Sequence, residues 1–130
     1  MTIFRKKNIN DYMDLHEERK GKATIITLSG RLDSSSSPEV EKKIVSTIVQ
    51  GNKDIVLDFG SLDYISSAGI RVLVLCNKEV EKLKGHIYLA SVPKTIENVL
   101  YITGFLQHFR LFEGQNQALE ELEKLEDDNS

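Results

Sequence analysis

Short apolar runs alternate with stretches of helical periodicity along most of the chain. The β-branched run at 23–28 follows a Lys-Gly-Lys turn and a mixed segment at 12–19, which together predict a hairpin. The run at 55–59 is typical of a strand buried on both faces, and residues 60–65 are expected to form the connection after it. Two more short strands are predicted, at 86–90 and 109–112.

Four segments have the three- and four-residue spacing that places apolar side chains on one helix face. The first is expected to start at Pro38 with Ser37 as its cap, because proline at the first helical position loses no backbone hydrogen bond. The second begins at Ser66 or Ser67, the third spans Pro93 to Gly104, and the fourth spans Gln115 to Glu126. The expected core positions are Val40, Ile44, Ile48 and Val49 in the first helix, and Ile70, Leu73, Val74, Asn77, Val80 and Glu81 in the second.

Strands that alternate with helices favour an α/β fold in which crossover helices cover a mixed sheet. We expect four to five strands and about four helices. The 130 residues suffice for one domain, with a core at about 12–125, a loose arm or short strand at 1–10 and an acidic tail at 127–130.

Composition narrows the function classes. The formal charge of −3 is unevenly distributed, because residues 113–130 contain seven acidic residues and one basic residue, Lys124. The sequence has no cluster of basic residues interleaved with aromatic ones, so we do not expect nucleic acid binding. We also expect no membrane segment and no secretory signal. The single Cys76 lies in an apolar run and is expected to be buried, and a cytoplasmic location is predicted.

Enzymatic and cofactor motifs are not evident. The three histidines, at 16, 86 and 108, lack metal-ligand spacing, and no glycine-rich phosphate loop follows a predicted strand. Ser66 and Ser67 lack the GxSxG context of a nucleophile elbow. We therefore expect a protein that is not an enzyme and needs no cofactor.

The most informative segment is Asp63–Leu73, which runs from a buried strand into a helix that begins with hydroxyl residues. One serine can be a simple N-cap. Gly69 in the first turn costs about 0.5–1 kcal/mol relative to alanine. Either a partner's backbone approaches closely there or the domain's own loop does, and the residues alone favour neither.

Two segments, ITLSGRLDSSSSPEVE and IVLDFGSLDYISSAGIRVLV, resemble the STAS domain shared by anti-sigma factor antagonists and sulfate transporters. The likeness covers about 12–125, and the length resembles the bacterial anti-anti-sigma branch. It implies that Ser67, with Ser66 as the alternative, accepts a phosphate from an anti-sigma factor that is itself a serine kinase. It also implies that a PP2C-type phosphatase reverses the modification. The partner surface would contain Asp33, Ser34, Ser66, Ser67, Gly69, Ile70 and Arg71.

Two positions depart from the family pattern. Ser66 stands where the sporulation proteins have Asp, and Arg71 stands where they often have Gly. Three functions stay open: a phosphorylation-controlled switch, a scaffold subunit of a stressosome-type or lipid-transport assembly, and a sensor of a nucleotide or other small ligand at the same corner.

Overall fold

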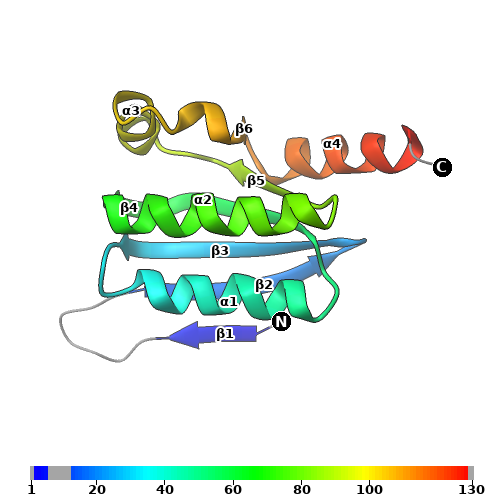
Figure 1. Cartoon of the computed structure of the whole chain (residues 1–130), viewed down its shortest axis with the longest axis horizontal. Helices are drawn as coiled ribbons and strands as arrows, with labels where there is room; N and C mark the ends of the chain where they lie inside the picture. Colours follow the sequence, from blue (N-terminus) through cyan, green and yellow to red (C-terminus); the bar gives the residue numbers. More distant parts are fainter. Residues whose placement is uncertain (1, 6–12, 129–130) are drawn as a thin grey trace.

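The computed structural model describes residues 2–5 and 13–128, which form one mixed sheet with helices on both faces (Figure 1). The six strands lie in the order β1-β2-β3-β4-β5-β6, so each strand pairs with its neighbour in the sequence. The pairs β1–β2 and β2–β3 are antiparallel, and the pairs β3–β4, β4–β5 and β5–β6 are parallel. The strands are β1 (Thr2–Arg5), β2 (Met13–Lys20), β3 (Ala23–Leu32), β4 (Asp54–Ile65), β5 (His86–Ala90) and β6 (Arg110–Phe112). The helices are α1 (Ser37–Val49), α2 (Ser67–Lys82), α3 (Lys94–Ile102), the short 3₁₀ turn η1 (Leu106–His108) and α4 (Gln115–Asp128).

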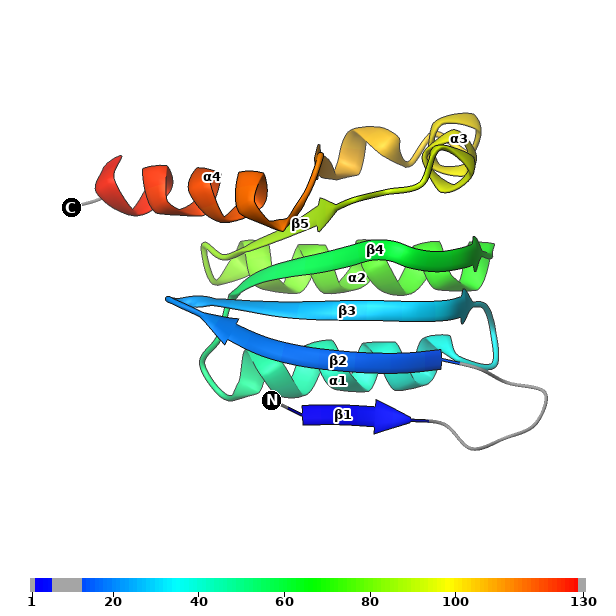
Figure 2. The same cartoon turned by 180° about the vertical axis from the view of Figure 1, so that it is seen from behind.

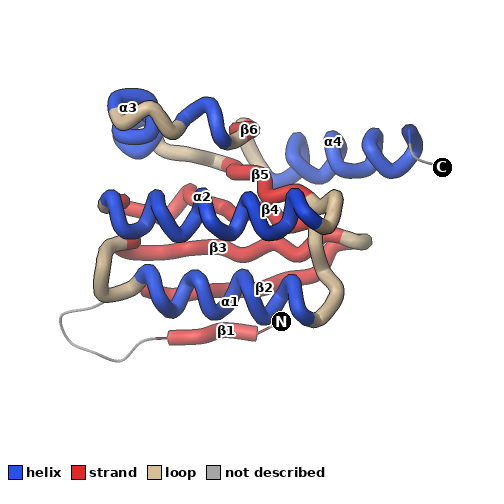
Figure 3. Tube along the Cα trace, in the orientation of Figure 1, coloured by secondary structure: helices blue, strands red, loops and turns tan. Residues whose placement is uncertain are grey.

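Two apolar clusters hold the helices on the sheet. The larger cluster joins α1, α2 and α3 to one face of β2 to β5, with Phe59 and Leu73 fully buried in it. The smaller cluster packs Ala118 and Leu122 of α4 against Ile25, Val56 and Tyr88 on the other face. Figure 2 shows the sheet from behind, with α1 and α2 side by side beyond it, and Figure 3 shows the same layers by element type. The predicted α/β class is confirmed.

The sheet is longer and wider than the sequence predicted. Thr2–Arg5 form β1 at the edge beside β2, which agrees with the short strand that was one of the two expectations for residues 1–10. The rest of 1–10, and Tyr12 at the start of the predicted hairpin, lie outside the described residues. Residues 60–65 are part of β4, because they pair with residues 29–32 of β3 after a shift in register. The expectation of a connection there was wrong. The predicted acidic tail also begins inside α4, which continues to Asp128.

The start of α1 and the buried faces of α1 and α2 also differ from the prediction. α1 begins at Ser37 after Ser36, whose side chain does not cap the helix, and Val49 is 78 % exposed at the other end. In α2 the buried positions include Val72 and Cys76, whereas Asn77 is half-buried and Glu81 is exposed. The predicted core stripe was therefore wrong in the second half of α2, where the buried residue is Cys76 rather than the predicted Asn77. Within the described residues, no helix combines the length and apolarity needed to cross a membrane.

Candidate functional site

The two adjacent serines have different structural roles at the start of α2. Ser66 is the N-cap, and its hydroxyl oxygen accepts a hydrogen bond of 3.3 Å from the backbone N–H of Gly69. Its own N–H donates to the carbonyl of Leu32 at 2.9 Å, which links the start of α2 to the end of β3. We call this region, with Asp33, Ser34, Ser66 and Ser67, the Ser67 corner. Ser67 is the first helical residue and is exposed, and within the described part of the chain its side chain has no hydrogen bond. Of the two hydroxyls, that of Ser67 is therefore the uncommitted one.

Gly69 is required by packing within the domain. A Cβ atom added there would lie 2.7 Å from Cγ of Leu32 and 2.9 Å from its carbonyl oxygen, closer than real side chains approach. It would also lie 3.3 Å from Cγ1 of Ile65. Of the two explanations that the sequence left open, the domain's own strand end is the correct one, because Gly69 is buried against it.

Asp33 organises the loop that joins β3 to α1. Its Oδ1 accepts hydrogen bonds from the N–H and hydroxyl of Ser35, at 3.0 and 2.7 Å, and from the N–H of Ser36 at 3.2 Å. These bonds, with the hydroxyl of Ser35 contributing most, lower the pKa of the Asp33 carboxyl group. Asp33 therefore carries a negative charge at neutral pH beside the strand end against which α2 begins.

Exposed side chains surround this corner on three elements. The guanidinium of Arg31, 4.2 Å from the ring centroid of Tyr64, also lies 3.6 Å from a carboxylate oxygen of Asp33. On α2, Arg71 is exposed one turn after Ser67, and Leu75 is 48 % exposed one turn further on. Residues four apart share a helix face, so α2 presents a hydroxyl, a cation and an apolar side chain in a line.

The structure brings most of the predicted site residues together and excludes two of them from the surface. Leu32 pairs with Ile65 at the carboxyl ends of β3 and β4, which sets Asp33 and Ser34 beside Ser66 and Ser67. Gly69 and Ile70 are buried, and Ile70 is 1 % exposed in the main core, so neither can touch a partner. Sequence reasoning missed Tyr64, because we placed it in a connection rather than at the end of a strand. Its register pairing with Arg31 is the feature that identifies it.

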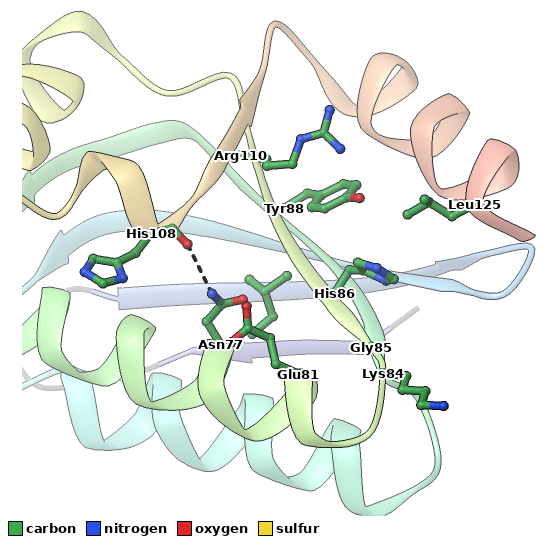
Figure 4. Close-up of a pocket in the computed structure, with 10 residues that line it drawn as sticks. Asn77, Glu81, Lys84, Gly85, His86, Tyr88, His108, Arg110 and Leu125 are labelled. Atoms are coloured by element: carbon green, nitrogen blue, oxygen red, sulfur yellow. Dashed lines mark hydrogen bonds between the residues drawn. The ribbon is translucent and has the colours of Figure 1, made fainter.

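A hollow of about 550 Å³ lies at the opposite end of α2, where α2 ends and β5 begins (Figure 4). The side chains of Lys84, His86, Tyr88 and Arg110 line it, and Asn77 donates a hydrogen bond of 3.1 Å to the carbonyl of His108 at its rim. Its lining contains no residue of the Ser67 corner. The hollow therefore gives no support to a small-ligand site at that corner.

Two features of the described residues bear on metal binding and on thiol chemistry. No three of their His, Cys, Asp or Glu side chains gather as a metal site. Cys76 is buried, as predicted, and burial raises the pKa of its thiol to about 12, with Glu41 and Glu79 adding to the shift. A thiol with that pKa is inert at neutral pH.

Comparisons with known proteins agree with this architecture. The STAS domain model matches residues 15–118. BtrV of Bordetella bronchiseptica, which has the name of an anti-sigma factor antagonist, is 33 % identical over 94 residues, covering 72 % of this chain and 81 % of its own. An anti-sigma factor antagonist from Mycobacterium paratuberculosis has the same fold, with a TM-score of 0.76 at 17 % identity over 84 % of this chain and 92 % of its own. Phosphorylated SpoIIAA of Bacillus has a TM-score of 0.67 at 23 % identity, over 83 % and 98 % of the two chains.

The chain therefore belongs to the STAS domain family. Within it, the chain falls in the anti-sigma factor antagonist branch, which the named relatives represent.

Proposed function

We propose that this protein is a cytoplasmic partner-switching regulator that binds an anti-sigma factor and thereby releases a sigma factor. The anti-sigma factor is also a serine kinase that phosphorylates Ser67, and a PP2C-type phosphatase restores the free hydroxyl. The observation that carries this proposal is the division of roles at the start of α2. Ser66 caps the helix, whereas the hydroxyl of Ser67 is exposed and uncommitted. A kinase needs an acceptor hydroxyl that projects from a fixed backbone towards the γ-phosphate.

The physical basis of the switch is a change of charge on an otherwise unchanged domain. Phosphorylation adds about −1.5 to −2 charges at neutral pH. At the N-terminus of α2 the helix dipole tolerates this charge, so the domain stays folded. A partner surface fitted to a small neutral hydroxyl instead meets a bulky dianion, with the carboxylate of Asp33 as a second negative group at the same corner. Loss of one central contact commonly costs 2 kcal/mol or more in binding.

Phosphate mapping tests the acceptor. The protein is incubated with ATP and the anti-sigma kinase encoded in the same genome, and the modified residue is located by mass spectrometry. We expect phosphate on Ser67, complete loss of labelling in Ser67→Ala, and labelling at Ser67 retained in Ser66→Ala. Labelling of a folded Ser67→Ala protein at the wild-type rate would place the acceptor elsewhere.

Binding of the same anti-sigma factor tests the switch. Ser67→Asp is expected to weaken it at least about 30-fold, which corresponds to about 2 kcal/mol. Asn116→Asp is a matched control, because it adds one carboxylate to the exposed first turn of α4, away from the Ser67 corner. Titration calorimetry measures both affinities. Equal affinity of Ser67→Asp and Asn116→Asp would contradict the proposed mechanism.

A further inference from the structure

The exposed face of α2 contains a cation whose role the switch described above does not explain. Arg71 is exposed, and within the described residues its guanidinium forms no hydrogen bond, ion pair or ring contact. The other cation at this corner, Arg31, is already engaged with the ring of Tyr64 and the carboxylate of Asp33. Arg71 is thus the cation that remains available to a new negative charge at the start of α2.

The helix geometry directs Arg71 towards Ser67. The two residues are four positions apart, so their Cβ atoms lie about 5–6 Å from each other on one face of α2. Long side chains on a helix lean towards its N-terminus, which is the direction from Arg71 to Ser67. The guanidinium group also presents paired N–H donors that match the oxygens of a phosphate.

We propose that Arg71 is the intramolecular partner of the phosphate on Ser67. This inference rests on the proposed function for the presence of that phosphate. Before modification the guanidinium is free to contact an acidic group of the anti-sigma factor. After modification it is drawn back along α2 to the phosphate. Phosphorylation then changes two adjacent points of the surface, because it adds a dianion and removes an available cation.

Lys78 provides a control for Arg71, because it is a second exposed cation on the same face of α2. Lys78 is exposed and lies eleven residues after Ser67, which is roughly 16 Å along the helix axis. At that distance its charge is largely screened in about 0.1 M salt. Replacement of Lys78 therefore changes net charge by the same amount as replacement of Arg71 without removing a contact.

The test uses full-length protein with phosphoserine incorporated at position 67 during synthesis, so that no kinase is needed. Phosphorus NMR follows the second ionisation of the phosphate, which has a pKa of about 6 in the absence of a partner. We expect this pKa to be about half a unit higher in Arg71→Ala than in the otherwise unmodified sequence, because loss of the guanidinium disfavours the dianion. Arg71→Lys should give an intermediate value, and Lys78→Ala should leave the pKa unchanged.

Three results would overturn the pairing: equal pKa values with and without Arg71, an equal rise in Lys78→Ala, or a rise in Arg31→Ala alone. The last result would identify Arg31 as the phosphate's partner. None of these outcomes depends on whether a kinase recognises Ser67. A failure of the proposed function would appear instead as absence of enzymatic labelling at Ser67, with the pairing still measurable in the phosphoserine protein.

Discussion

Replacement of Gly69 by alanine tests how the Ser67 corner is held to the sheet. An alanine in a helix interior is favoured over glycine by about 0.8–1.0 kcal/mol, so the helix alone would predict a more stable protein. The added Cβ would however meet two atoms of Leu32 at 2.7 and 2.9 Å. One of them is the carbonyl oxygen that accepts the N–H of Ser66, and a backbone atom cannot move aside as a flexible side chain can.

The opposing terms can be compared in magnitude. Overpacking of a filled site costs about 1–3 kcal/mol. Displacement of the Leu32 carbonyl weakens a hydrogen bond worth about 0.5–1.5 kcal/mol. After subtraction of the helix propensity term, we expect Gly69→Ala to lower the free energy of unfolding by about 1–3 kcal/mol.

Urea unfolding followed by circular dichroism measures this change, provided that the slope of free energy against urea is unchanged. Ala68→Gly is the matched control at the neighbouring position, where the reverse substitution should cost roughly 0.5–1 kcal/mol through propensity alone. A Gly69→Ala protein as stable as the wild type, or more stable, would refute the argument that Leu32 leaves no room for a side chain.

Three further predictions follow from single contacts. Ser66→Ala should lower the free energy of unfolding by about 1 kcal/mol, because it removes the N-cap of α2, whereas Ser67→Ala should change it by less than about 0.5 kcal/mol. Urea titrations measure both variants, and equal losses would contradict the roles assigned to the two serines. Asp33→Asn should destabilise the protein by about 1 kcal/mol at pH 7. Because the pKa of Asp33 is lowered in the folded state, this stabilisation is complete above the unfolded pKa near 3.8 and is lost as the pH falls through the lower folded pKa; a difference from wild type that stays constant down to pH 2 would count against it. At pH 8, Cys76 in the folded protein should react with iodoacetamide about three orders of magnitude more slowly than an ordinary thiol, and fast labelling without unfolding would contradict the raised pKa.

The order of elements could be predicted from the sequence, because each strand and helix has its own local pattern. The alternation of β-branched runs with helical spacing located the parts of the sheet from β2 onwards and all four α-helices. The true length of β4 could not be predicted. Residues 60–65 contain Gly60 and two exposed polar positions, and they become a strand only by pairing with β3 after a register shift, which is a long-range interaction.

The candidate site shows the same division between local and long-range information. Local sequence identified the serines and the unusual glycine at the start of α2. The choice between Ser66 and Ser67 as phosphate acceptor depends on which hydroxyl accepts the hydrogen bond from the N–H of Gly69. The need for glycine at position 69 depends on its contact with Leu32, 37 positions earlier in the chain. Ile70 was assigned to the partner surface by resemblance, and its burial in the core corrects that assignment.

Strand order has a consequence for how the chain assembles on the ribosome. Each new strand pairs with the one made just before it, so the sheet can grow in one direction as synthesis proceeds, beginning with β1 and β2. No early strand has to wait for a late one, and loop closures stay short. The last edge to form, β6, has only three residues and begins with the charged Arg110, which discourages pairing with a neighbouring nascent chain.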